Sequence, residues 1–351
     1  MNKTKLLYAA GALAITPLAN AQAQAQGQVT VYGLFDAATR HATNTGANRA
    51  SRTTMEDGII TGSRLGFRGR EDLGGGLLAL FTLESGFDPS TGLSLQGTPT
   101  GDYGQSTAPT RFWGREVHVG LRGAWGGVTL GRQYTVAHAL AARFQAQGNP
   151  NSTAHSLFSS HHIARQDNVV RFDAKAGDVD LLASTTFGEQ AGSSSANGSW
   201  ALGAGYTKGP VSLGAYFQNL KNLAGTETRQ VAGAGGNVKL GTALALFGGV
   251  MQRDDAASPQ KNRARTLGAN WQVLPLLQLS TQHYRDDQSG SAALAGARTV
   301  DWLVATYRLS QRTDVYGVVD RNKVTGGYAR PAFMGVKGTQ NGVVVGLRHR
   351  F

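Results

Sequence analysis

The last nine residues of the chain, Val343–Phe351, read VVVGLRHRF. Val343, Val345 and Leu347 occupy one set of alternate positions, and the other set includes Arg348 and Arg350. A period of two residues is typical of a β-strand whose two faces meet different surroundings. The apolar face would meet a core in a soluble protein, or lipid in a transmembrane barrel with a water-filled lumen. This strand alone leaves both alternatives open.

The first residues have the pattern of a secretory signal peptide. Lys3 and Lys5 precede an uncharged and mostly apolar run over residues 6–18, and Ala19-Asn20-Ala21 has the small-x-small form of a cleavage site. The run is too short to cross a bilayer as a helix. We therefore expect a signal peptide over residues 1–21, and its removal lowers the formal net charge from +12 by two lysines to about +10.

The composition of the remaining chain favours an exported, β-rich protein. The chain contains 48 Gly, 9 Pro and no Cys. The missing cysteines exclude disulfides, thiolate metal sites and cysteine nucleophiles. After the signal segment no run of eighteen apolar residues occurs, so the sequence predicts no transmembrane helix. We expect one domain over residues 22–351, with signal cleavage possible up to residue 25.

Alternating segments of about ten residues recur along the chain, separated by clusters of Gly, Asn, Asp and Ser. The segments that we predict as strands are 28–40, 59–72, 76–88, 112–123, 126–133, 167–175, 178–187, 199–207, 210–218, 229–240, 243–252, 263–273, 276–285, 297–308, 313–321 and 342–351. Many connections are short, such as Gly177-Asp178, whereas alternate ones are long, such as 89–111 and 134–166. This asymmetry predicts an all-β fold, a 16-stranded antiparallel up-and-down transmembrane β-barrel. A short helical turn is expected around residues 136–144.

Charged residues sort onto one face of the predicted strands. Leu65 and Phe67 would face lipid, whereas Arg68 would face water. Asp36 and Glu84 are the acidic residues that we expect in the lumen. A charge on the lipid face near the midplane costs about 2–4 kcal/mol, so a barrel requires this sorting.

Eight sequence motifs follow one another along the chain: VTVYGLFD (29–36), SRLGFRGREDLG (63–74), LESGF (83–87), VGLRG (119–123), GGVTLGRQ (126–133), RQDNVVRF (165–172), YRLSQRT (307–313) and the terminal Phe351. In this order they resemble segments of the Gram-negative trimeric porins, most closely the beta-proteobacterial type. Each motif alone is weak, but together they are specific and extend over essentially the whole mature chain.

The resemblance implies a homotrimer in the lipid bilayer of the Gram-negative outer membrane, with lipopolysaccharide at the outer leaflet. It implies passive diffusion of small hydrophilic solutes through a water-filled channel, without enzymatic activity or a cofactor. It also implies that the third long loop folds into the lumen and narrows it. In this family a terminal aromatic, here Phe351, is a signal to the barrel-insertion machinery.

Relatives carry a ladder of arginines on the wall of the constriction. Arg64 and Arg165 match this ladder by motif and by inward parity, and Arg68 lies on the same face as Arg64. Arg115 matches by motif, but if Val117 faces lipid then simple alternation puts Arg115 there too, unless a bulge intervenes. We therefore expect these four arginines at the constriction and leave the face of Arg115 open.

The third loop departs from the family pattern. Residues 134–166 contain no Asp and no Glu, but they include His138, Arg143, His161 and His162. Low-dielectric walls focus the field of such a basic constriction and concentrate anions. The sequence therefore predicts an anion-selective channel. If the loop histidines line the pore, anion preference should rise as the pH falls from about 7 to 5; solvated loop turns are the alternative position for these histidines.

Functions other than that of a general porin have less support in the sequence. A solute-specific anion channel, for phosphate or an organic anion, and an adhesin-like barrel acting through its loops both remain open. No Gly-x-Ser-x-Gly elbow supports a hydrolase. His161-His162 with Asp167 could suggest a metal site, but no third ligand has a fixed spacing. The arginines are spread over many strands of an exported chain, which disfavours nucleic acid as a partner. We expect no enzyme, metal site or cofactor.

Overall fold

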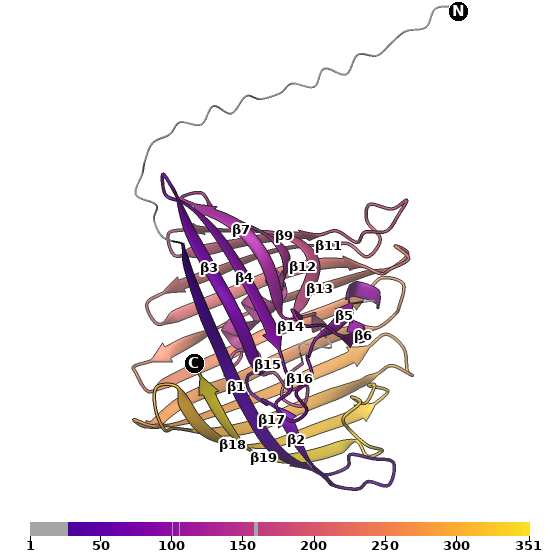
Figure 1. Ribbon diagram of the computed structural model, residues 1–351. Coiled ribbons are helices and arrows are strands. Elements are labelled where there is room, and N and C mark those ends of the chain that lie inside the picture. The colour runs from indigo at the N-terminus through magenta and orange to yellow at the C-terminus, as the bar shows by residue number, and fades with distance from the viewer. Residues whose placement is uncertain (1–26, 100, 105, 158–160) are drawn as a thin grey trace, which may run out of the picture.

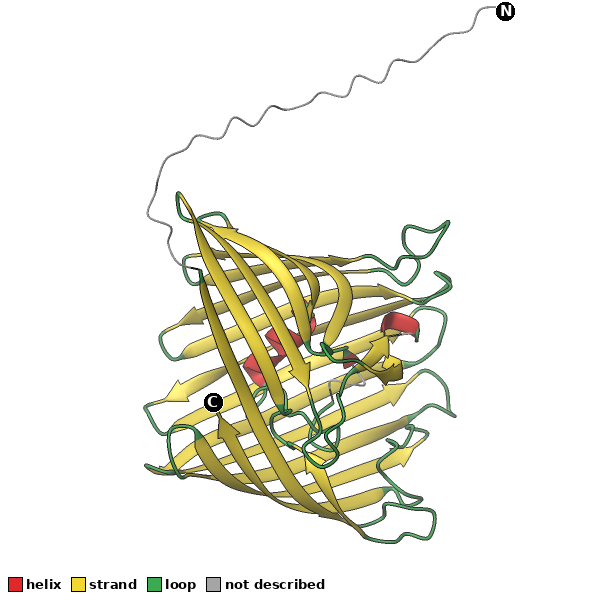
Figure 2. Cartoon of the chain, viewed as in Figure 1, coloured by secondary structure: helices red, strands yellow, loops and turns green. Residues whose placement is uncertain are grey.

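A computed structural model of the chain describes residues 27–351, except for residues 100, 105 and 158–160. The predicted signal peptide lies outside the described residues. Most of the described residues form one sheet that closes on itself as a barrel (Figures 1 and 2).

Each strand of the wall pairs antiparallel with its neighbours, and β19 pairs with β1 to close the barrel. The wall strands are β1 (Gln28–Ala42), β2 (Arg52–Asp57), β3 (Arg64–Gly74), β4 (Leu77–Gly86), β7 (Glu116–Gly123), β8 (Gly126–Tyr134), β9 (Arg165–Ala176), β10 (Val179–Thr186), β11 (Ser199–Lys208), β12 (Val211–Lys221), β13 (Thr228–Leu240), β14 (Leu244–Asp255), β15 (Lys261–Leu274), β16 (Leu277–Ser289), β17 (Gly296–Arg308), β18 (Thr313–Gly326) and β19 (Thr339–Arg350). β2 and β3 pair with successive parts of β1 and share one place in the wall. The 17 strands of the sheet thus fill sixteen places, which confirms the predicted barrel.

The connections are short at one end of the barrel, called here the turn end, and long at the other, the loop end. Three turn-end glycines, Gly177, Gly209 and Gly241, have positive φ angles of 58°, 54° and 65°. Tight turns need this left-handed conformation, which glycine adopts without steric cost. The loop after β4 carries a small hairpin, β5 (Gly97–Pro99) and β6 (Ser106–Thr110), with the 3-10 turn η1 (Asp102–Gly104) between its strands.

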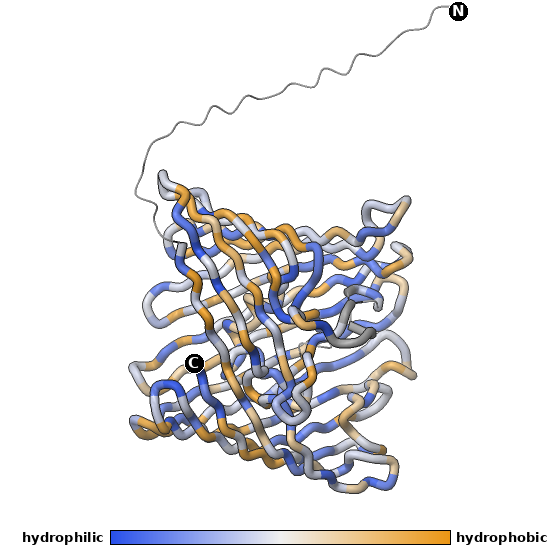
Figure 3. Tube along the Cα trace, in the orientation of Figure 1, coloured by the Kyte–Doolittle hydropathy of each residue, from blue (hydrophilic) through white to orange (hydrophobic). Residues whose placement is uncertain are grey.

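Hydrophobic and hydrophilic residues alternate along many of the strands, as the colours of the tube in Figure 3 show. In β19, Val343, Val345 and Leu347 are 54%, 67% and 51% exposed on the outside, whereas Val344 and Arg348 are buried on the inside. This pattern confirms the period of two in the last nine residues. Among the described residues, none of the helices has the length and hydropathy of a membrane-crossing helix.

One predicted strand differs from the structure. Residues 59–72 are predicted to form one strand, but β3 begins only at Arg64, and residues 58–63 turn into the lumen. Ile59 and Ile60 are buried there. Gly58 permits the turn, because a Cβ atom at this position would lie 2.3 Å from Cγ of Asp36.

The third long loop, residues 135–164, folds inside the barrel. It opens with the helix α1 (Val136–Ala141), which passes into the 3-10 turn η2 (Ala142–Phe144), in the region where a helical turn was predicted. The Oγ1 atom of Thr135 accepts a hydrogen bond from the backbone N–H of His138 and so caps the helix. Figure 2 shows this helix in red within the barrel, where it packs on β10–β13.

Inner-wall glycines make room for the inserted helix. A Cβ atom at Gly203 would lie 2.3 Å from a methyl carbon of Leu140, and one at Gly249 would lie 2.5 Å from the ring of Phe144. The main buried cluster of the molecule therefore lies between α1, η2 and the inner wall, where Tyr216 and Trp302 join it.

Candidate functional site

Three of the predicted arginines converge on the inner wall, where several strands end partway up the barrel. Arg64 is the first residue of β3, Arg165 is the first of β9, and Arg115 directly precedes β7. Glu84 of β4 and Tyr134 of β8 lie between them. We call these five residues the arginine cluster.

Glu84 is the acceptor at the centre of the arginine cluster. Its Oε1 atom lies 2.5 Å from Nε of Arg115 and 3.9 Å from Nη1 of Arg64. Its Oε2 atom accepts a hydrogen bond of 2.9 Å from the hydroxyl of Tyr32. Glu84 is 1% exposed, so its charge interacts with the neighbouring groups of the wall and not with water.

Tyr134 fixes two of the guanidinium groups. Its hydroxyl accepts hydrogen bonds from Nη2 of Arg115 at 2.9 Å and from Nη2 of Arg165 at 2.5 Å. The guanidinium carbon of Arg165 also lies 4.2 Å from the centre of the tyrosine ring, within the range of a cation–π contact. The two cations are thus held side by side.

Alternation left open which face of the wall Arg115 occupies. The structure places its side chain on the lumen side. Regular strand pairing of β7 begins at Glu116, so the parity of Val117 does not extend back to Arg115. The side chain of Arg115 is 3% exposed and reaches Glu84 across the neighbouring strand. Arg115 is therefore a buried member of the cluster.

Arg64 and Arg68 of the predicted arginine wall are both in contact with water. The side chain of Arg64 is 20% exposed. Arg68 is exposed and rests on the ring of Tyr32, 4.1 Å from its centre. Besides Glu84, the nearby carboxylate is that of Glu116 in β7, so the four arginines outnumber the acidic groups around them.

Arg143 fastens the inserted loop to the wall. Its Nη2 atom lies 2.6 Å from Oδ2 of Asp180, and its Nη1 atom donates to the carbonyl oxygen of Leu213 at 3.1 Å. Gly205 lies directly beneath the guanidinium, because a Cβ atom there would be 2.4 Å from its central carbon. The charge of Arg143 is thus paired at the wall.

Two loop histidines pair with buried wall carboxylates. Nε2 of His155 lies 3.2 Å from Oδ2 of Asp320, and Nε2 of His161 lies 3.2 Å from Oδ1 of Asp286. Both histidines are almost completely buried. Asp286 and Asp320 were not singled out in the sequence, although both have inward parity in their strands.

The other two loop histidines pack against aromatic rings. The ring of His138 stacks on Tyr134 at 5.0 Å between centres, and His162 meets both His138 and Tyr216 edge-on. Burial, with the charge of His161, lowers the pKa of His162 to about 3. Burial also holds the pKa of His138 well below its usual value, helped by the charges of His162 and Arg165. The structure therefore places His161 and His162 in buried positions between the loop and the wall, which is neither of the two positions weighed in the sequence analysis.

Asp36 points inward, but residues 58–63 cover it. It is fully buried and accepts hydrogen bonds from the hydroxyl of Tyr316 at 2.6 Å and the backbone N–H of Thr61 at 3.3 Å. This covering segment also pairs with the inserted loop, since the N–H groups of Asn151 and Ser152 donate to the carbonyls of Ile60 and Ile59. The third loop therefore crosses the lumen and narrows it.

Phe351 completes the seam between the last and first strands. Its backbone exchanges two hydrogen bonds of 3.1 Å with Gly33 of β1. The phenyl ring covers Gly33 on the outer face, where a Cβ atom would lie 2.2 Å from the ring. The ring is 51% exposed, so it faces the surroundings of the barrel.

The barrel architecture recurs in solved structures. An anion-selective porin from Comamonas acidovorans superposes with a TM-score of 0.72 and 22% identity, over 93% of this chain and 100% of that one. OmpT of Vibrio cholerae, folded in vitro and in its trimer form, superposes with a TM-score of 0.64 and 17% identity, over 93% and 99% of the two chains.

Sequence comparisons give the family. Outer membrane porin protein 32 of Delftia acidovorans is 26% identical over 95% of this chain and 97% of its own length. An outer membrane porin protein of Bordetella pertussis is 33% identical over 43% of this chain, and the match spans only 40% of that protein. Residues 9–327 match the model of the Gram-negative porins. The chain therefore belongs to the Gram-negative porin family, whose members are channels of the outer membrane.

Proposed function

We propose that the barrel is a passive, anion-selective channel for small hydrophilic solutes. The observation that carries this proposal is the excess of arginine at the narrowed lumen, where Arg64, Arg68, Arg115 and Arg165 face two carboxylates, Glu84 and Glu116. The inserted loop contributes no Asp or Glu to the charges at the constriction. Because sixteen strands enclose more space than side chains fill, water and solutes pass this charged wall.

The basic excess extends beyond the arginine cluster. A cavity of about 450 Å³ at the turn end lies between α1 and strands β7–β10. Its charged lining residues are Arg122, Arg143, Arg171, Lys175, Asp173 and Asp180. An anion that has passed the constriction therefore meets a second positive surface. The anion-selective porin with the same fold supports this assignment.

We also propose that three copies of the chain assemble. The trimer form of the Vibrio cholerae barrel supports this oligomeric state. Purified protein should migrate as a trimer in a gel run without heating, and as a monomer after boiling. A single monomeric species in both lanes would contradict the proposal.

The proposed surroundings are the outer membrane and its lipopolysaccharide. On the outer face, towards the loop end, β15–β18 carry basic side chains that would meet lipid phosphates: Lys261, Arg263, Arg265, Arg285, Arg321 and Lys323. Three acidic residues, Asp254, Asp287 and Asp301, accompany them. We further propose that residues 1–21 are removed on export, and that Phe351 is recognised by the barrel-insertion machinery.

The reversal potential in a KCl gradient across a planar bilayer tests the selectivity. We expect chloride to be preferred over potassium, and preference for potassium would overturn the proposal. Arg68→Gln should reduce the chloride preference, because a unit charge about 7 Å from the ion path contributes about 0.6 kcal/mol in water, or roughly a factor of 3. Arg265→Gln removes one arginine from the outer face and should leave the selectivity unchanged.

A further inference from the structure

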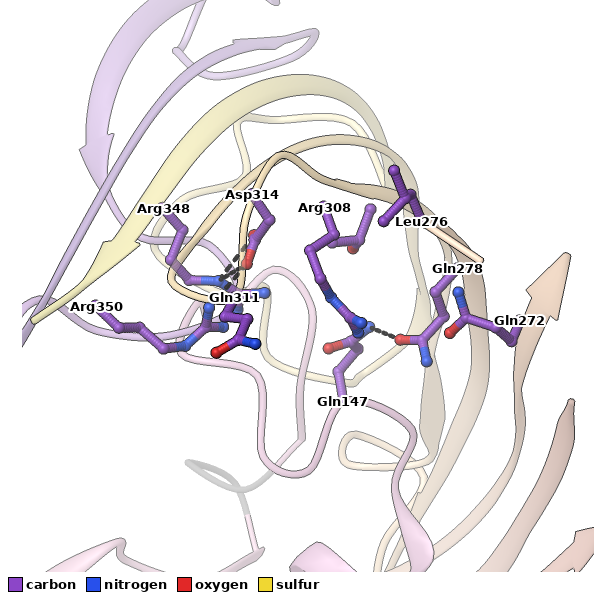
Figure 4. A pocket seen from close by; sticks show the side chains of 10 residues that line it. Gln147, Gln272, Leu276, Gln278, Arg308, Gln311, Asp314, Arg348 and Arg350 are labelled. Carbon is purple, nitrogen blue, oxygen red and sulfur yellow. Dashed lines mark hydrogen bonds and ion pairs between the residues drawn. The ribbon is translucent and has the colours of Figure 1, made fainter. Parts of the chain in front are cut away.

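We propose that the lumen contains a binding site for hydroxylated organic anions, such as sugar acids, at the turn end of the barrel. The site is a cavity of about 430 Å³ between the tip of the inserted loop and strands β15–β19 (Figure 4). The inference rests on the proposed channel function, and it adds a class of solute to it.

Guanidinium groups supply the charge of this cavity. Figure 4 shows Arg348 and Arg350 beside Asp314, with Nε of Arg348 at 3.0 Å and Nη1 of Arg350 at 2.9 Å from its carboxylate oxygens. Arg308 also lines the cavity. Its exposed side chain makes no hydrogen bond or ion pair with any of the residues described, so it is available to a carboxylate. Three cations around one anion leave two positive charges for a ligand.

Amide groups supply hydrogen bonds of both kinds. Gln147 of the inserted loop donates to Oγ of Ser280 at 2.8 Å and to Oε1 of Gln278 at 3.4 Å. Gln272 and Gln311 lie on the same lining. An amide both donates and accepts, as a hydroxyl group does, so four glutamines suit a ligand with several hydroxyl groups.

The backbone of Gln147 adds a second indication. This residue has a φ of +62°, a left-handed conformation that non-glycine residues seldom adopt. Residues held in such conformations cluster at ligand sites, because surrounding contacts must fix them. Here the contacts with β16 hold the Gln147 amide over the cavity.

The lining also indicates what the site excludes. Among the described residues that line it, Leu276 has the only aliphatic hydrocarbon side chain. An aromatic or fatty acid would find little apolar surface to cover, whereas a sugar acid would exchange its water for guanidinium and amide groups. The charge selects an anion, and the amides select hydroxyl groups.

The test is the block of chloride current by gluconate in planar bilayers holding the purified full-length channel. Gluconate should reduce the current along a saturating curve, and Arg308→Gln should raise the half-saturating concentration roughly tenfold, the loss of one charged hydrogen bond. Gln278→Leu should raise it as well, and benzoate should block more weakly than gluconate. Arg265→Gln removes an arginine from the outer face of β15 and should leave the half-saturating concentration unchanged.

Three results would overturn the site. They are a block by gluconate that never saturates, an equal effect of Arg265→Gln and Arg308→Gln, and equal block by benzoate and gluconate. The reversal potential in KCl alone separates this failure from that of the proposed function. An anion-selective channel without saturable block lacks only this site, whereas a cation-selective channel overturns the proposed function itself.

Discussion

Glu84 is the residue on which the geometry of the arginine cluster depends. It accepts hydrogen bonds from Arg115 and Tyr32, and its side chain is buried together with that of Arg115. Removal of one partner of a buried ion pair typically costs about 3–5 kcal/mol, because the other charge stays behind unpaired. We expect Glu84→Gln to lower the free energy of unfolding by about this amount.

Urea unfolding followed by tryptophan fluorescence measures this loss. The double substitution Glu84→Gln with Arg115→Gln should recover part of it, because the buried guanidinium of Arg115 is removed together with its carboxylate partner. Glu71→Gln, on an exposed part of β3, is the matched control and should be close to neutral. Equal stability of Glu84→Gln and the wild type would mean that the pair is not buried as described.

The histidines of the loop make its docking sensitive to acid. His162, which faces His138, His161 and Tyr216, has a pKa lowered to about 3. A lowered histidine pKa means that the released loop binds a proton below about pH 6.5, while the docked loop does not. Docking should therefore weaken as the pH falls below about 6.5, by about 2 kcal/mol at pH 5.

Single-channel conductance between pH 7 and 4 reports this weakening as openings to a wider state. His162→Phe keeps a ring but removes the proton site, so its conductance should change less with pH than that of the wild type. His349→Phe, on the outer face of β19, should behave like the wild type. Identical pH profiles of wild type and His162→Phe would contradict the argument.

Parity could predict which arginines face the lumen, but not how deeply each is buried. Arg64 and Arg68 follow from alternation within β3. Arg115 could not be placed, because the first residue of a strand cannot be located to better than a few positions from sequence. The burial of the loop histidines could not be predicted for another reason, since the burial of a loop side chain depends on the part of the wall that the loop contacts.

The inserted loop is the element that sets the width of the lumen, and glycines of β11 and β14 form its seat. Gly249→Val would place side-chain atoms against the ring of Phe144, since a Cβ atom alone would lie 2.5 Å from it. Overpacking of this kind typically costs about 1–3 kcal/mol. We expect the loop to leave its seat, and single-channel conductance to increase.

The matched control for this substitution is Gly317→Val on the outer face of β18. A Cβ atom at Gly317 has only one neighbour within 4 Å, at 3.8 Å, so the barrel should accept the larger side chain. Unchanged conductance in Gly249→Val would show that the inner wall accommodates the larger side chain without releasing the loop.

Strands and turns could be predicted because their signals are local. The two-residue period and the glycine turns can each be recognised within about ten residues of sequence. The sixteen places of the wall follow from counting them. The route of the third loop could not be predicted. Asn322 donates to the carbonyl of Ala154 across 168 positions in the chain, and nothing in the loop sequence names that partner.

For the whole molecule, selectivity should depend on salt concentration. The excess positive charge lies on a water-filled wall, where the Debye length is about 10 Å at 0.1 M and about 3 Å at 1 M. We expect the chloride preference to be greatest in dilute KCl and to decline towards 1 M. Reversal potentials at a fixed concentration ratio, measured over this range, check the trend; a preference independent of salt would indicate size selection.

The crossing of the lumen by the third loop also has a consequence in time. The loop holds residues from both ends of the chain: Asn151 and Ser152 bond to residues 59–60, while His155 meets Asp320 of β18. These partners come together only after the last strand has joined the first. The loop can therefore make all of these contacts only in a closed barrel, so the narrowing of the lumen is completed at or after closure.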